Sequence, residues 1–196
     1  NIAGVLTPSH VSAQSTGGIS DVRVAASYSL RRTLQVGLGV HVFPGQNRTL
    51  LGRDYADSLK IGGFTEANIF NFSGSGVSVG VLAQPTSHLN LGFSALFGGA
   101  MHLRLGDSAV VGSASAPSRW SVSAAYTGFA GTGLSVRYGG EKWSDMRGLG
   151  TAGLGIHDAT EFGVGAEIAG PKISGVAMAV RIGFRSRDLP FAIGAQ

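Results

Sequence analysis

The sequence predicts an all-β protein, a transmembrane antiparallel up-and-down β-barrel with at least eight strands in this chain. Apolar and polar residues alternate with the period of two that is typical of strands. Only 13% of the 196 residues are charged and 43% are hydrophobic, whereas soluble domains average about a quarter charged. No segment approaches the ~18 consecutive apolar residues of a membrane helix, and closed barrels also satisfy every backbone group in lipid.

The predicted strands form four hairpins. Every second residue from Val22 to Leu30 is apolar or aromatic, and after a turn at 31–33 the same alternation runs from Leu34 to Val42. Three further hairpins repeat this design. The predicted strands are 21–30, 34–43, 77–84, 89–104, 120–127, 134–143, 162–168 and 176–185.

Ionisable side chains avoid the apolar faces of these strands, where only Lys142 lies, at a strand end. An Arg or Lys that faces mid-bilayer lipid costs roughly 2–4 kcal/mol, which explains the partition. The residues assigned to the polar, lumen-facing side are Asp21, Arg23, His41, His102, Arg104, Arg137, Glu141, Glu167, Arg181 and Arg185.

Short and long connections alternate, as in outer-membrane barrels with short periplasmic turns and long extracellular loops. We expect turns at 31–33, 85–88, 128–133 and 170–174, and loops at 45–72, 106–118, 144–159 and from 186 onward. This places 45–72 outside the cell. Two aromatic girdles follow, with Trp120, Trp143, Phe162 and Phe184 at the outer strand ends and Tyr28 and Tyr126 at the inner ends.

We expect one barrel domain over residues 1–196, incomplete at both ends. The chain starts at Asn1 without a signal-peptide pattern, and residues 189–196 do not read as a finished strand. A soluble β-sandwich with one solvated face is the alternative, because it also produces alternation. Low charge and the asymmetry of the connections favour the membrane barrel and a location in the bacterial outer membrane.

No motif predicts catalysis, a cofactor or a metal, so we expect no enzyme. The Gly148–Gly153 segment matches G-x-G-x-x-G but lacks the strand-turn-helix context of a dinucleotide site. The five histidines lack metal-ligand spacing, although His41 and His102 are expected to share the lumen. An outer-membrane lipid-modifying enzyme remains an alternative, and it would need Ser, His and a carboxylate gathered at one rim.

The expected partners are outer-membrane lipid and a hydrophobic small molecule. The net charge is +4, but the basic residues are scattered, so no nucleic-acid partner is predicted. No protein partner is predicted either. The loop at 45–72 is unusually apolar and could capture a ligand, or its side chains could pack on the barrel rim. Its candidate ligand-binding residues are Leu50, Leu51, Phe64, Ile69, Phe70 and Phe72.

The succession of hairpins resembles the FadL-type outer-membrane transport proteins. The resemblance covers most of the chain, in segments 18–28, 34–40, 74–85, 89–94, 117–126, 143–144 and 162–167. It implies a larger barrel with an N-terminal plug, and passive uptake of long-chain fatty acids or other hydrophobic compounds. A general porin or a small structural barrel is the alternative function.

The resemblance also implies a role for the arginines of the lumen, which would pair with a ligand carboxylate. These residues are Arg23, Arg104, Arg137, Arg181 and Arg185. A structural role is the other interpretation, in which they pair with Asp21, Glu141 and Glu167 across the barrel wall.

Overall fold

The computed structural model describes residues 9–55, 62–129, 131–149, 155–173 and 176–192. These residues are almost entirely strand, with one short 3-10 helix, η2 (Trp143–Met146). No helix in these ranges has the length and apolar character needed to span a membrane. Strands β10 (Gly155–Ile156) and β13 (Phe191–Ala192) pair separately from the main sheet.

One antiparallel sheet contains the other eleven strands. They are β1 (Ser9–Ile19), β2 (Val22–Arg31), β3 (Leu34–Val42), β4 (Gly45–Tyr55), β5 (Phe64–Thr86), β6 (Leu89–Leu105), β7 (Val110–Ser115), β8 (Ser118–Phe129), β9 (Thr132–Lys142), β11 (Ala159–Ile173) and β12 (Val176–Arg187).

The sheet is an up-and-down meander in which three of the long strands are each interrupted once. β1 and β2 are separated by residues 20–21, β3 and β4 by Phe43–Pro44, and β7 and β8 by Ala116–Pro117. Proline lacks the amide hydrogen that the ladder needs, which explains the last two interruptions. β1 pairs with β4 and β2 with β3, while β5 pairs with both β3 and β4. The predicted antiparallel meander is therefore confirmed.

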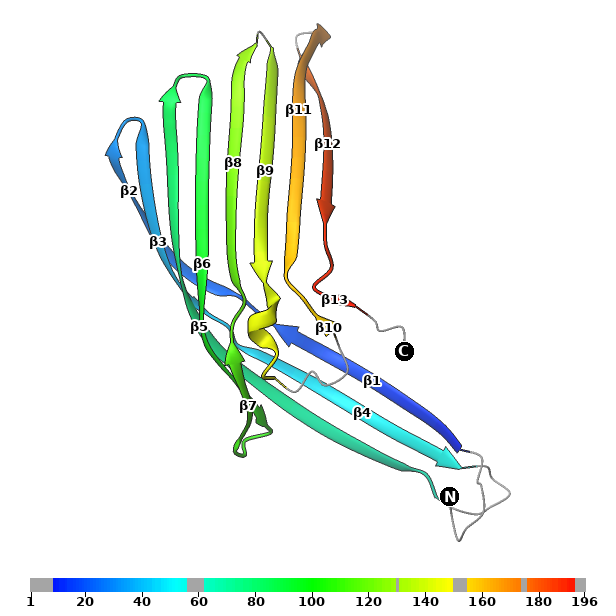
Figure 1. The fold of residues 1–196 in the computed structure, drawn as a ribbon. Coiled ribbons are helices and arrows are strands. Elements are labelled where there is room, and N and C mark those ends of the chain that lie inside the picture. Colours follow the sequence, from blue (N-terminus) through cyan, green and yellow to red (C-terminus); the bar gives the residue numbers. More distant parts are fainter. Residues whose placement is uncertain (1–8, 56–61, 130, 150–154, 174–175, 193–196) are drawn as a thin grey trace.

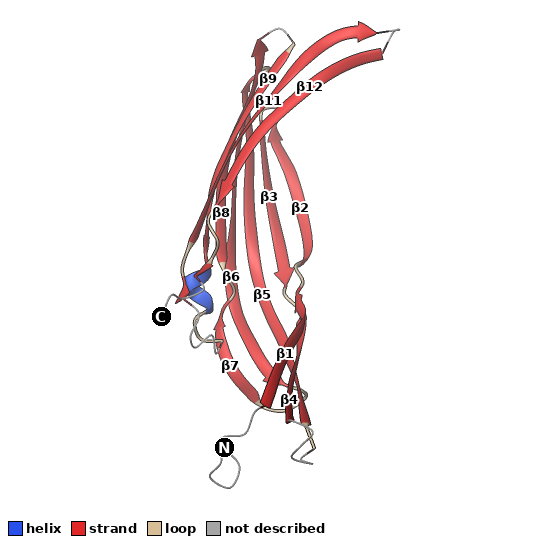
Figure 2. Cartoon of the chain, turned by 90° about the vertical axis from the view of Figure 1, so that its right-hand side faces the viewer, coloured by secondary structure: helices blue, strands red, loops and turns tan. Residues whose placement is uncertain are grey.

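The sheet curls into a half-barrel, with tight turns at the top of Figure 1 and long extensions at the bottom. Figure 2 shows the curl from the side. Arg119 on β8 reaches Asp21 beside β2 at 2.9 Å, although β3, β5 and β6 lie between. Four strand spacings in a flat sheet would span about 19 Å. In the described part of the chain, β12 does not pair with β1 or β2, so the curl stays open.

All four expected loops prove to be partly strand, and the one from 186 onward contains the end of β12 and β13. The predicted loop at 45–72 is wrong, because β4 and the first half of β5 extend their hairpin through it. The predicted loop at 106–118 contains β7, and β1 was not predicted at all. The Gly-rich loop at 144–159 begins in η2 and includes β10. All of these segments lie below the apolar part of the sheet, where the alternation that predicted the strands changes sides.

Candidate functional site

The convex face of the upper sheet is an exposed apolar band. Residues paired across neighbouring strands share a face, and the register places Val40 beside Val77 and Val77 beside Phe97. Many of these side chains are highly exposed to solvent: Leu38 is 69% exposed and Ile182 is 70% exposed. Monomeric soluble proteins rarely expose a contiguous apolar surface of this extent. The band therefore marks a surface that something other than water covers.

The apolar band has a sharp lower boundary on β5. Above it the convex side of the strand carries Val77 and Val79, whereas below it the same side carries Asn71, Ser73 and Ser75. Neighbouring strands change at the same height. Convex residues below the boundary include His10, Ser12, Gln14 and Thr16 on β1, and Gln46 and Arg48 on β4.

Below this boundary the concave face is apolar and packed. We define the lower apolar cluster as Phe43, Leu96, Met101, Leu103, Ala116 and Leu149, with Phe70 and Phe72 packed against it. Met101 is 2% exposed. The lower extension thus carries a packed apolar cluster on its concave face and a mostly polar convex face, on which Leu50 and Ile69 are also found. The upper sheet has an apolar convex face instead.

An irregularity in β6 overturns part of the predicted lumen. Gly74 pairs with Met101 but Gly76 pairs with Gly98, so β6 carries one extra residue between these pairs. Such a bulge reverses the alternation beyond it. Met101 and Leu103 therefore face the concave side, and the expectation that His102 and Arg104 face the lumen is wrong. Both residues are exposed on the convex side.

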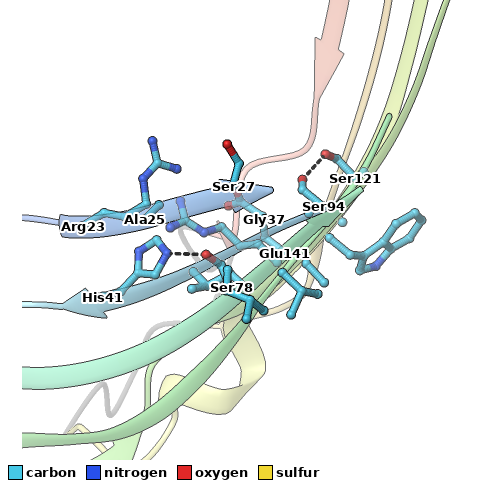
Figure 3. Close-up of a pocket in the computed structure, with 18 of the residues that line it drawn as sticks. Arg23, Ala25, Ser27, Gly37, His41, Ser78, Ser94, Ser121 and Glu141 are labelled. Atoms are coloured by element: carbon cyan, nitrogen blue, oxygen red, sulfur yellow. Dashed lines mark hydrogen bonds between the residues drawn. The ribbon is translucent and has the colours of Figure 1, made fainter. Parts of the chain in front are cut away.

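Above the lower apolar cluster, the concave face forms a polar groove of about 470 Å³ (Figure 3). Seven strands contribute to it, from β2 to β11. The ionisable side chains that line it are Arg23, His41, Arg119, Arg137, Glu141 and Glu161. The upper concave face is thus polar where the convex face is apolar.

His41 lies at the floor of this groove and is 3% exposed. Its Nδ1 is 2.7 Å from Asp21 Oδ1 and its Nε2 is 2.9 Å from Ser78 Oγ. A carboxylate only accepts hydrogen bonds, so Nδ1 donates to Asp21, and a ring with a single proton accepts from the Ser78 hydroxyl at Nε2. The ring also stacks on Phe43, with centroids 6.0 Å apart. Arg119 donates to the second oxygen of Asp21 at 2.9 Å.

The contacts of Asp21 set its protonation. Burial raises its pKa, but the hydrogen bonds from His41 and Arg119 outweigh that effect and hold the pKa below the ordinary aspartate value. Asp21 is therefore a carboxylate at neutral pH, and it fixes the orientation of the imidazole.

Most arginines on the concave face are paired with carboxylates. Arg181 lies 2.7 Å from Glu167, Arg185 lies 2.6 Å from Glu161, and Arg137 is 3.9 Å from the same Glu161. Arg187, which the sequence did not single out, bonds Glu141 at 2.6 Å. Within the described ranges Arg23 has no carboxylate within ion-pair distance, so its charge is free to meet a ligand.

The residues predicted to form a capture loop do not share one patch. Phe70 and Phe72 reach the lower apolar cluster. Leu51 and Phe64 lie on the same face as these two but remain exposed. Leu50 and Ile69 lie on the opposite, convex face, because they alternate with the inward residues of the same strands.

Two further expectations are settled by placement. Trp143 does not join a convex aromatic girdle, since its indole nitrogen donates to Glu141 on the concave side at 2.7 Å. Trp120 does lie on the convex face, packed edge-on against Tyr138 with ring centroids 5.5 Å apart. Of the G-x-G-x-x-G segment, Leu149 packs into the lower apolar cluster, and residues 150–153 lie outside the described ranges.

The association of Asp21 and Ser78 with His41 was not predicted. Their separations of 20 and 37 residues carry no motif, and only the strand register brings them together. The one signal in the sequence is a glycine two residues before His41 and another two residues before Ser78, which are Gly39 and Gly76. Among the described residues, no three His, Cys, Asp or Glu side chains gather as a metal site would require.

Comparisons of this chain with protein-family models, with curated proteins and with solved structures found no match. Inferences about its function therefore come from the geometry of its two faces, an apolar convex band outside and a charged groove inside.

Proposed function

We propose that this chain forms part of the wall of a bacterial outer-membrane β-barrel that takes up hydrophobic or amphipathic small molecules, such as long-chain fatty acids. The observation that carries the proposal is the exposed convex band with its abrupt polar boundary. From Leu89 to Phe97 on β6 the band is nine residues long, or about 26 Å along the strand. Strands that cross a membrane are about 9–11 residues long and tilted by ~45°, so the length of this band fits a membrane-spanning strand.

The boundary on β5 favours lipid over a protein partner as the cover of this band. A protein partner would leave an irregular outline, whereas the convex face changes from apolar to mostly polar at one height on β5, with Leu50 and Ile69 as the apolar exceptions below it. Below that height the sheet continues with a water-compatible exterior. In the proposed orientation this lower extension lies outside the cell, and the tight turns face the periplasm.

The concave face supports an amphipathic ligand. The charged groove, with the unpaired Arg23, adjoins the lower apolar cluster that contains Phe72. A head group and an alkyl tail would each meet matching chemistry, and burial of the tail would contribute about 0.8 kcal/mol per CH₂. A general porin fits less well, because apolar side chains fill the lower part of the concave face.

The chain's two tryptophans provide a test of insertion. Two variants, Trp143→Phe and Trp120→Phe, each retain one indole. After refolding into vesicles that contain brominated phosphatidylcholine, we expect strong quenching of Trp120 and weak quenching of Trp143. Equal quenching of both residues, or quenching of Trp143 alone, would contradict a lipid-facing convex band.

Uptake is tested separately from insertion. We expect saturable binding of the fluorescent fatty acid cis-parinaric acid to the inserted protein. Phe72→Ala should weaken it at least about fivefold, whereas Ile69→Ala, on the opposite face of β5, should not. Heat-modified migration on gels checks that both variants fold. Sugar-driven vesicle swelling without parinaric acid binding would identify a porin instead.

A further inference from the structure

The hydrogen-bond chain Ser78–His41–Asp21 has the connectivity of a nucleophile, its general base and the group that orients the base. Ser78 Oγ donates to His41 Nε2 at 2.9 Å, and His41 Nδ1 donates to Asp21 at 2.7 Å. Both distances lie within the range of functional nucleophile–base pairs. With Nδ1 donating to Asp21, the neutral ring presents Nε2 as the acceptor for the Ser78 hydroxyl, which is the tautomer that the chemistry requires.

The fold holds these three groups without flexible loops. His41 is on β3 and Ser78 on β5, and Asp21 directly precedes β2. Glycines clear the space between them: a side chain at Gly39 would meet Ser78 Oγ at 2.6 Å, and one at Gly76 would meet Phe43 and Leu96. The buried imidazole is clamped against Phe43, so it is preorganised in the manner that catalysis favours.

The nucleophile is also accessible. Ser78 lines the groove of about 470 Å³ and is only half-buried. Figure 3 shows its hydroxyl on the floor of the groove, beside His41 and below Arg23. A second hydroxyl pair in the same groove, Ser94 and Ser121 at 2.9 Å, has no imidazole bonded to it and serves as an internal comparison.

From this arrangement we infer that the groove is an esterase site, with Ser78 as nucleophile, His41 as general acid–base, and Asp21 as the residue that positions His41. The substrate class is a carboxylic ester with an apolar acyl chain, since the groove adjoins Leu96 and the lower apolar cluster. The inference does not rest on membrane insertion or uptake, and it runs against the expectation from sequence that the chain is not an enzyme.

The reaction balances with water as the only co-reactant. Ser78 Oγ attacks the ester carbonyl carbon while its proton passes to His41 Nε2. The carbon–oxygen bond to the alcohol then breaks, and His41 returns the proton to the leaving alkoxide. Water, deprotonated by His41, attacks the acyl–Ser78 ester and releases the carboxylic acid, which restores the serine.

Arg23 supplies the charge that the transition state requires. Backbone amides in the middle of a sheet are occupied by the ladder, so a developing oxyanion needs a side-chain donor. Arg23 is the register partner of His41, which places their Cβ atoms about 5 Å apart on the same face. Arg23 lacks a carboxylate partner in the described structure, and its guanidinium, which points away from Ser78 in Figure 3, must turn toward Ser78 to reach the oxyanion.

The test uses the full chain, refolded in detergent, and an alkyl fluorophosphonate. This reagent phosphonylates serines that a neighbouring base activates, with release of fluoride. We expect one label per chain, mapped by peptide mass spectrometry to Ser78 and not to Ser94 or Ser121. Ser78→Ala should abolish labelling and hydrolysis of 4-nitrophenyl butyrate. Ser123→Ala, a serine on the same face that lies outside this groove, should retain both.

Variants of the base and its positioning residue complete the test. His41→Gln should slow labelling about 10²-fold or more, as loss of a general base does. Asp21→Asn should lower kcat with little change in KM. An unlabelled wild-type chain, a label spread over several serines, or hydrolysis that survives Ser78→Ala would overturn the assignment. The mapped label on the wild-type chain decides the matter even if His41→Gln does not fold.

Discussion

At the scale of single residues, substitution of Gly39 should change the reactivity of Ser78 more than the stability of the fold. A methyl group there would lie 2.6 Å from Ser78 Oγ, and this hydroxyl can avoid it by rotating away from His41. The added carbon would also lie 3.3 Å from the Ala25 Cβ, which must give by a few tenths of an ångström. We expect Gly39→Ala to cost about 1 kcal/mol, yet to lose fluorophosphonate labelling. The control is Gly163→Ala, where the added carbon meets only the Phe184 carbonyl at 3.7 Å.

Asp21 should make the stability of the fold depend on pH. The pKa of Asp21 is lower in the folded chain than the ordinary aspartate value. Its contribution to the free energy of unfolding is therefore fully present above the ordinary pKa and disappears as pH falls through the folded pKa. Because the side chain is 37% exposed, we expect a contribution of only about 1 kcal/mol. Denaturant midpoints of the wild type and Asp21→Asn should differ at pH 7 and converge near pH 2. A constant difference would contradict this assignment.

The residue-level site shows where sequence reasoning stops. Strand periodicity placed Asp21, Arg23 and His41 on one face, and the structure agrees. It could not place Ser78 against His41, because the contact depends on the register between β3 and β5 and on the space left by Gly39. The pairing of Arg185 with Glu161 depends on register in the same way, and Glu161 was not among the predicted residues. Glu167, which pairs with Arg181, was predicted as a partner for the arginines.

At the scale of elements, the bulge in β6 makes a prediction about two adjacent residues. Met101 is fully buried in the lower apolar cluster, while His102 points to the exposed convex side. Met101→Ala should therefore cost about 2–4 kcal/mol through lost packing and a cavity, and His102→Ala should be neutral within ~0.5 kcal/mol. Equilibrium unfolding by denaturant measures both. Equal effects would mean that β6 runs without the bulge.

The same element explains which strands the sequence predicted. Segments with a continuous apolar outer face, such as 34–43 and 120–127, were found because their alternation has one phase. β4 and the lower half of β5 alternate in the opposite phase, with Phe70 and Phe72 inward, and were read as an apolar loop. On β3, β4 and β5 the faces do not change across Pro44, but the apolar residues move from one face to the other. In β6 one extra residue changes the phase itself. Neither signal is strong enough to be recognised without the neighbouring strands.

At the scale of the whole molecule, the boundary between the two kinds of exterior predicts opposite tolerances along one strand. Val79 and Ser73 both lie on the convex face of β5, above and below the boundary. Val79→Arg should destabilise the vesicle-inserted protein by about 2–4 kcal/mol, whereas Ser73→Arg should change little. Unfolding from vesicles by guanidinium chloride measures both. A similar cost at both positions would show that the boundary does not coincide with the edge of the lipid.

The fixed height of the convex band also makes the molecule a gauge of bilayer thickness. Stiff strands of about 26 Å cannot shorten or stretch to suit a thicker hydrocarbon layer, so mismatch must be absorbed by the lipid or by tilt. Folding yield should peak in vesicles of short-chain phosphatidylcholines and decline as the acyl chains lengthen. Such a preference would favour the thin bacterial outer membrane over thicker membranes, through geometry alone and without a sorting signal.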